Sequence, residues 1–93
     1  MEELFPNTED AAKEKHVPVV DQFNFSVMVS VGADAHPMIQ AHYIEWIALQ
    51  TESGLQFHFL KPGDPPCYEF QVQENERFVA AFAYCNLHGL WKA

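Results

Sequence analysis

The sequence has few basic residues and no long apolar run. Lysine and arginine together number 5 against 13 acidic residues, a formal net charge of −8 in 93 residues. A chain with so little positive charge lacks the basic surface that nucleic-acid binding requires, so we expect no nucleic-acid partner. No apolar stretch approaches the roughly 20 residues that cross a bilayer, so we expect no membrane association. The start of the chain, Met1 to Pro6, carries acids where a signal peptide is basic and then apolar, which predicts a cytoplasmic protein.

Cysteine is also scarce. A secreted domain of this size usually carries several disulfides, whereas this chain has Cys67 and Cys85 alone. Two cysteines cannot supply a four-thiolate metal site within one chain. The one local pairing of metal-ligand type is Cys85 with His88, three residues later. Cys67 follows a Pro-Pro pair, and we expect it to be a free thiol.

Short alternating segments dominate the rest of the chain. Period-2 alternation and β-branched or aromatic enrichment predict strands over residues 23–31, 42–51, 55–60, 67–72, 78–84 and 88–91, preceded by one helical turn near residues 11–15. Ser53-Gly54 predicts a hairpin turn. Six or seven short strands without a long helical pattern indicate an all-β fold, an antiparallel β-sandwich. No boundary for a second domain is visible, so residues 1–93 are expected to form a single domain.

Histidine is enriched, and its positions carry the chemistry. Of the 5 histidines, His16, His36, His42 and His88 lie at predicted loops or strand ends, and His58 sits within a strand between two phenylalanines. Imidazole nitrogens with one thiolate suit a borderline ion such as iron or zinc, although isolated histidines are more often structural. Residues three apart face opposite sides of a strand, so Cys85 and His88 share a site only if the chain leaves the strand near Asn86. From composition and spacing, iron, zinc and no metal all remain open.

Three sequence blocks resemble one family. They are residues 14–19 (EKHVPV), residues 36–47 with His36-Pro37-Met38 and the segment that starts at His42, and residues 85–91 (CNLHGLW). In this order they are similar to the superoxide reductases, the neelaredoxin and desulfoferrodoxin family. The resemblance runs from about residue 14 to 91 and implies an immunoglobulin-like β-sandwich. Desulfoferrodoxins carry an additional four-cysteine iron domain for which this chain has no residues, so it resembles the one-iron-centre members.

The resemblance implies a set of ligands and a reaction. His16, His36, His42 and His88 would surround one iron ion in a plane, with Cys85 on one axial side and the opposite position open to substrate. Superoxide would take one electron from Fe(II) there and, with two protons, leave as hydrogen peroxide. Residues 1–15 would lead into the first ligand. His58 is assigned no role.

The same resemblance assigns two further residues and the partners. Lys15 would attract the anionic substrate and help to orient a proton-donating water, and Glu14 would cap the sixth position after oxidation. Rubredoxin or a similar small iron protein would donate the electron. Open sheet edges favour pairing between copies, so we expect a homo-oligomer, a dimer or tetramer. Two alternatives are a structural His/Cys zinc site in an Ig-like binding module and an iron electron carrier without catalysis.

Overall fold

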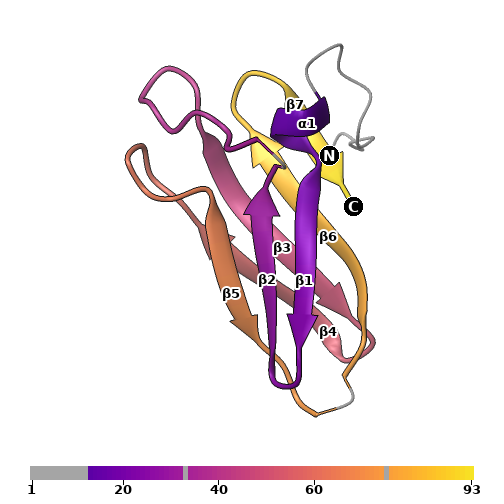
Figure 1. Ribbon diagram of the computed structural model, residues 1–93. Coiled ribbons are helices and arrows are strands. Elements are labelled where there is room, and N and C mark those ends of the chain that lie inside the picture. Colours follow the sequence, from indigo (N-terminus) through magenta and orange to yellow (C-terminus); the bar gives the residue numbers. More distant parts are fainter. Residues whose placement is uncertain (1–12, 33, 75) are drawn as a thin grey trace.

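The computed structural model describes residues 13–32, 34–74 and 76–93, with side chains from residue 15 onward. One helical turn precedes seven strands that form two antiparallel sheets (Figure 1). The elements are α1 (Lys13–His16), β1 (Pro18–Phe23), β2 (Ser26–Val31), β3 (Ile44–Thr51), β4 (Gly54–Phe59), β5 (Cys67–Gln71), β6 (Phe78–Cys85) and β7 (Gly89–Lys92). The prediction of an all-β antiparallel sandwich of about seven strands is confirmed.

The two sheets differ in size. One has the order β1-β2-β5, and the other has the order β4-β3-β6-β7. Alternate residues of the central strands face inward and form the core between the layers, as the period-2 pattern requires. The fully buried members of that core include Val27, Val29 and Val31 of β2, Ile47 and Leu49 of β3, and Ala81, Ala83 and Cys85 of β6.

One strand prediction is wrong. The alternation over residues 23–31 predicted a single strand, but a two-residue turn at Asn24 and Phe25 divides it, with Phe23 paired to Ser26. Asn24 favours a turn because its side chain can bond the local backbone. Phe23 and Phe25 therefore lie at a hairpin tip, where they are 67% and 57% exposed. Because the turn has two residues, the period-2 alternation of the sequence continues across it.

The remaining boundaries shift by one or two residues. The segment predicted as residues 42–51 begins at Ile44, and His42 instead forms an isolated bridge with Ile39. The hairpin between β3 and β4 turns at Glu52 and Ser53, one residue before the prediction. Gly54 follows with φ of 148°, a backbone conformation that glycine adopts readily because it has no Cβ atom. No helix within the described residues is long and apolar enough to cross a membrane.

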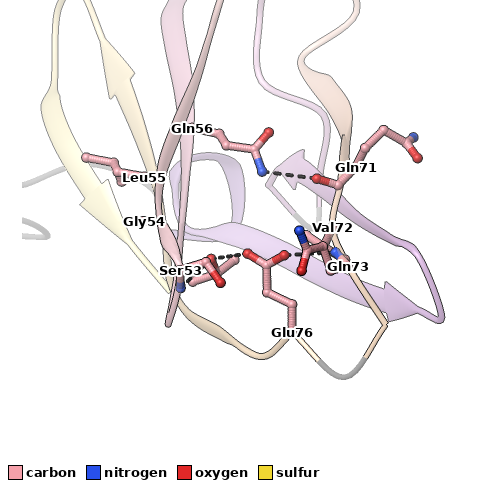
Figure 2. A pocket seen from close by; sticks show the side chains of 9 residues that line it. Ser53, Gly54, Leu55, Gln56, Gln71, Val72, Gln73 and Glu76 are labelled. Atoms are coloured by element: carbon pink, nitrogen blue, oxygen red, sulfur yellow. Dashed lines mark hydrogen bonds between the residues drawn. The ribbon is translucent and has the colours of Figure 1, made fainter.

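A buried carboxylate ties the lower end of the sandwich together. Glu76, in the connection between β5 and β6, accepts hydrogen bonds from the Gln73 backbone N–H at 2.8 Å and from the Thr51 hydroxyl. Figure 2 shows its carboxylate between Ser53 and Gln73. Its backbone carbonyl accepts a bond from the Gln22 side chain at 2.9 Å. One residue thereby joins the β3–β4 hairpin, the β5–β6 connection and β1.

We expect Glu76→Gln to destabilise the fold in a pH-dependent way. The backbone N–H of Gln73 and then the Thr51 hydroxyl hold the pKa of Glu76 below its ordinary value of 4.5, against the opposing effect of burial. A lowered folded-state pKa stabilises the protein above the unfolded-state pKa, and this stabilisation is lost as the pH falls through the folded-state pKa. The substitution should lower the melting temperature at pH 7, and the difference should shrink at pH 3. Circular dichroism melts of both proteins measure this.

Glu74→Gln supplies the matched control, since Glu74 is exposed in the same connection. It should melt like the native chain at both pH values. An equal loss of stability in the two variants, or a Glu76 effect that does not depend on pH, would contradict the role given to Glu76.

Candidate metal centre

Three segments far apart in the sequence meet at one end of the sandwich. The helical turn α1 ends at His16, the connection between β2 and β3 carries His36 and His42, and the turn between β6 and β7 follows Cys85 and contains His88. All three lie at the upper end in Figure 1, opposite the β3–β4 hairpin. The expectation that loops and strand ends bring these residues together agrees with this arrangement.

The β6–β7 hairpin explains how Cys85 and His88 reach one point. β6 ends at Cys85, residues 86–88 form the turn, and Cys85 pairs across the hairpin with Gly89. Gly89 has φ of 78°, the left-handed conformation that three-residue hairpin loops place on glycine. Cys85 therefore keeps the inward orientation of β6 while His88, beyond the strand, can turn toward it. The predicted departure of the chain from the strand near Asn86 is confirmed.

The four imidazole rings form a cyclic cluster in which each ring neighbours two others. The ring centroids of His16 and His36, and of His36 and His42, are 4.6 Å apart; those of His42 and His88 are 5.0 Å apart, and those of His88 and His16 4.9 Å. Neighbouring rings stand at 75–89° to one another. Across the diagonal of this cluster, the ring centroids of His16 and His42 are 6.2 Å apart. Four rings in a near-square, each turned edge-on to the next, surround a common centre.

The metal-binding atoms themselves converge. One potential ligand atom from each of His16, His36, His42 and Cys85 lies within 4.8 Å of the others. The His16 Nε2 atom is 3.1 Å from both His36 Nε2 and His88 Nδ1, and His88 Nδ1 is 3.8 Å from Cys85 Sγ. His42 Nε2 is buried without a hydrogen-bond partner. A buried polar atom without a partner is costly unless something else binds it.

His36 is held in the tautomer that a metal requires. Its Nδ1 lies 2.6 Å from the Pro37 carbonyl oxygen, which can only accept a hydrogen bond, so the proton is on Nδ1 and the Nε2 lone pair is free. Burial, reinforced by the three neighbouring histidines, lowers the pKa of His36 to about 4, although the bond to Pro37 opposes this. His36 therefore stays neutral at pH 7, the state in which imidazole binds a metal.

Lys15 lies close enough to the cluster to act on it electrostatically. The pKa of His42 is lowered by burial first, then by His88, His16 and Lys15. Lys15 itself is exposed. The structure thus puts a solvent-facing cation near the histidines. The side chain of Glu14 lies outside the described residues.

The residues present fit a metal ion. Neutral imidazole nitrogens that face one another at 3.1 Å repel unless a proton or a cation lies between them, and the His42 nitrogen lacks any other partner. A thiol beside them completes a donor set of borderline character. We therefore assign this cluster as a metal site. Cys67 and Cys85 are both free, and Cys67 and His58 lie outside the cluster, since His58 stacks on Tyr68 at 3.6 Å.

Asn86 joins two of the ligand-bearing segments. Its Oδ1 accepts a hydrogen bond from the Tyr43 N–H at 2.9 Å, and its Nδ2 donates to the Ala41 carbonyl at 3.1 Å. Its own backbone N–H donates to the Tyr43 carbonyl at 3.1 Å. Three bonds thus hold the backbone on both sides of His42 against the residue that follows Cys85. Asn86 was noted in the sequence only as the point where the strand ends, and its position inside the CxxH turn was the available signal.

Trp91 of β7 packs against the cluster from within the sandwich. It is fully buried, and its ring stacks on His16 with centroids 4.8 Å apart and planes 27° apart. The sequence analysis did not place it near the metal centre, because a tryptophan in a strand is more often part of a core. The contact orients the ring of a candidate ligand from within the core.

The chain is similar to known proteins in sequence and in fold. The desulfoferrodoxin family profile matches residues 8–93. The desulfoferrodoxin of Desulfarculus baarsii is 47% identical over 93 residues, which is 100% of this chain and 72% of that protein. The superoxide reductase of Treponema pallidum superposes with a TM-score of 0.93 at 41% identity, over 97% of this chain and 74% of the other. For a Giardia intestinalis superoxide reductase (1Fe-SOR) the TM-score is 0.73 at 36% identity, over 87% and 96%.

The fold and the cluster define an all-β metalloprotein with a His/Cys metal site. Within that class, the chain belongs to the desulfoferrodoxin family, and superoxide reductases are among the solved structures that it matches. The predicted family resemblance is confirmed.

We expect Asn86→Ala to weaken metal binding by about 10-fold, because changes to groups that support ligands typically cost 10–100-fold in affinity. Loss of the side chain removes the bonds to Ala41 and Tyr43 that hold His42 near Cys85 and His88. Titration of the metal-free protein in competition with a chelator measures the affinity. Asn24→Ala, at the distant β1–β2 turn, should bind as the native chain does. Equal affinities for native and Asn86→Ala proteins would remove Asn86 from the site.

Proposed function

We propose that this chain is a superoxide reductase with one iron ion held by His16, His36, His42, His88 and Cys85. The observation that carries the proposal is the cyclic cluster of four imidazoles with the Cys85 thiol beside it. These residues would hold the ion, and the family resemblance implies that one further position would stay open to substrate. Membership of the family, together with superoxide reductases as structural relatives, supports the assignment of the substrate.

Iron is the proposed metal because of the donor set. Imidazole and thiolate together suit iron as well as zinc, but zinc in structural sites is closed with four ligands, and this cluster offers five. When bound, iron supplies the single electron that converts superoxide, with two protons, into hydrogen peroxide. The family assignment disfavours the two alternatives, a structural zinc site in a binding module and an iron carrier without catalysis.

The chain's own residues set the charge at the centre. The pKa values of His36 and His42 are both lowered, so these two imidazoles stay neutral and would offset none of the charge of a bound ion. The Cys85 thiolate offsets one unit. A local excess of positive charge thereby remains in a chain of net charge −8 that would otherwise repel an anion. Lys15 adds a second cation, and by the resemblance it would draw superoxide in and hold a water that delivers a proton.

Other features of the proposal come from the resemblance. Glu14, two residues before His16, would cap the open position after oxidation, because a carboxylate is a hard ligand suited to Fe(III). Rubredoxin or another small iron protein would return the electron, and the chain would act as a dimer or tetramer. Residues 1–93 would form one domain, with residues 1–15 as the segment that leads into the first ligand. The cytoplasmic location stays a prediction.

The topology supports an immunoglobulin-like description of the sandwich. Strands β1, β2 and β5 correspond in order to A, B and E of that fold, and β3, β6 and β7 correspond to C, F and G. β4 extends the second sheet beside β3.

Cys85→Ser should abolish a red-region absorption band of the oxidised protein. We expect the protein purified without added metal to contain one iron per chain, and its ferric form to show thiolate-to-iron charge transfer in the visible spectrum. Serine removes the sulfur donor, whereas Cys67→Ser, outside the cluster, should keep the band. Metal analysis that finds zinc and no iron, or a band that persists without Cys85, would overturn the ligand assignment.

Lys15→Ala should slow the reaction of the reduced protein with superoxide by about 3- to 10-fold, at the low end of electrostatic steering effects. It should also weaken the dependence of the rate on ionic strength. Arg77→Ala changes the net charge equally, but Arg77 immediately precedes β6, at the end of that strand opposite Cys85, so this variant should leave the rate nearly unchanged. Pulse radiolysis gives the bimolecular rate constants. Equal rates for native and Lys15→Ala proteins would remove Lys15 from the mechanism.

A further inference from the structure

A second candidate site lies at the end of the sandwich opposite the metal centre. There, where Thr51 of β3 pairs with Phe78 of β6, a cavity of about 460 Å³ opens between the β3–β4 hairpin and the end of β5. Figure 2 shows the Glu76 carboxylate on one side of this cavity and, on the other, Gln56, whose Nε2 donates a 3.0 Å hydrogen bond to the Gln71 carbonyl. Sites for small molecules typically measure roughly 300–1,000 Å³. The Glu76 cavity, as we call it, therefore has room for an organic ligand.

The lining of the Glu76 cavity is rich in hydrogen-bonding groups and poor in charge. Leu55 and Val72 add apolar surface to it. Among the described residues that line the cavity there is no lysine, arginine or histidine. A ligand would therefore meet one full negative charge and no positive charge. Besides Glu76, the polar side chains are hydroxyls and amides, those of Thr51, Ser53, Gln56, Gln71 and Gln73.

Glu76 carries that negative charge in a buried position, with 9% of its surface exposed. Hydrogen bonds from neutral groups, first the Gln73 N–H and then the Thr51 hydroxyl, lower its pKa, so it is ionised at pH 7. A carboxylate has about four lone-pair sites, and these bonds leave capacity for a further donor. Buried charges are usually paired with an opposite charge, and none of the described lining residues supplies one.

We propose that the Glu76 cavity binds an aliphatic diamine or polyamine, with one ammonium group on the Glu76 carboxylate. An ammonium group donates hydrogen bonds and accepts none, which matches the carboxylate and the hydroxyl and amide oxygens around it. Charge-assisted bonds of this kind are stronger than neutral ones. The methylene chain would pack on Leu55 and Val72, and a second ammonium group would reach the amide oxygens of the lining glutamines. The net charge of −8 raises the concentration of cations near the surface.

The donor set favours an organic cation over a metal ion. Calcium and magnesium need several oxygen atoms packed closely around one point, carboxylates foremost. This cavity offers one carboxylate, and its other oxygens are spread over β3, β4, β5 and two connections. A volume of about 460 Å³ is also far larger than a single ion. An extended cation with charges at its two ends fits such separated groups.

The Glu76 cavity is independent of the metal centre. None of its lining residues belongs to the His/Cys cluster, which lies at the other end of β3 and β6. The binding of a diamine therefore depends neither on the proposed reaction with superoxide nor on the identity of the metal.

Isothermal titration calorimetry of the metal-loaded protein with putrescine, at pH 7 and constant ionic strength, tests this site. We expect one molecule to bind per chain. Glu76→Gln should weaken the binding by about 10-fold or more, since hydrogen bonds to charged groups are the stronger ones. Butanediol, which has the same carbon chain without the charges, should not compete. Circular dichroism reports whether Glu76→Gln is folded at the temperature of the titration.

Ser53→Lys tests the same site with Glu76 intact. Ser53 lies in the exposed turn between β3 and β4 and hydrogen-bonds the Glu76 carboxylate. The longer side chain would put its own ammonium group on that carboxylate, so the variant should lose the binding of putrescine even if Glu76→Gln folds poorly.

Glu74→Gln is the matched control for charge. It removes the same charge from the same connection, but Glu74 is exposed and does not line the Glu76 cavity, so this variant should bind putrescine as the native chain does. The proposal is overturned by a native chain that does not bind, by an equal loss in Glu74→Gln and Glu76→Gln, or by unchanged binding to Ser53→Lys. It is also overturned if magnesium displaces putrescine at equal concentration, because the site would then be one for a metal ion.

Discussion

The structure depends on the convergence of nitrogen lone pairs at the end of the sandwich. Imidazole nitrogens that face one another at 3.1 Å repel unless a proton or a cation lies between them, and burial keeps His36 neutral. The backbone must therefore hold them together against that repulsion. It does so through pairing of β3 with β6, whose ends carry the segments with His42 and Cys85, and through the bonds of Asn86 across them. The paired strands of the sandwich thus fix the relative positions of the ligand-bearing segments, which three separate loops could not do.

Local chemistry made much of this predictable. The CxxH spacing required the chain to leave its strand after Cys85, and Gly89 in a left-handed conformation ends the resulting turn. The gap between the strands predicted over residues 23–31 and 42–51 indicated a loop that carries His36 and leads to His42. Alternation located most strands within one or two residues. It failed at Phe23 and Phe25, because a two-residue turn preserves the period of two that it interrupts.

Contacts between distant segments could not be predicted in the same way. The stacking of Trp91 on His16 and the clamp of Asn86 on the backbone around His42 join residues more than 40 positions apart, and neither leaves a periodic signal. The sequence likewise does not show which side of a strand faces the core. Alternation in β4 shows that Leu55, Phe57 and Phe59 share one side of the strand, but only the position of the second sheet decides which side is the core.

Strand β6 connects the core of the sandwich to the metal centre. Its inward residues, Ala81 and Ala83, are small where the two sheets pack closely, and the same alternation leads to Cys85 at the end of the strand. Phe82 and Tyr84 lie between them and point to the opposite face of the sheet. The register that fills the core therefore also turns the Cys85 sulfur toward the histidines, so the position of this ligand follows from the pairing of the sheet.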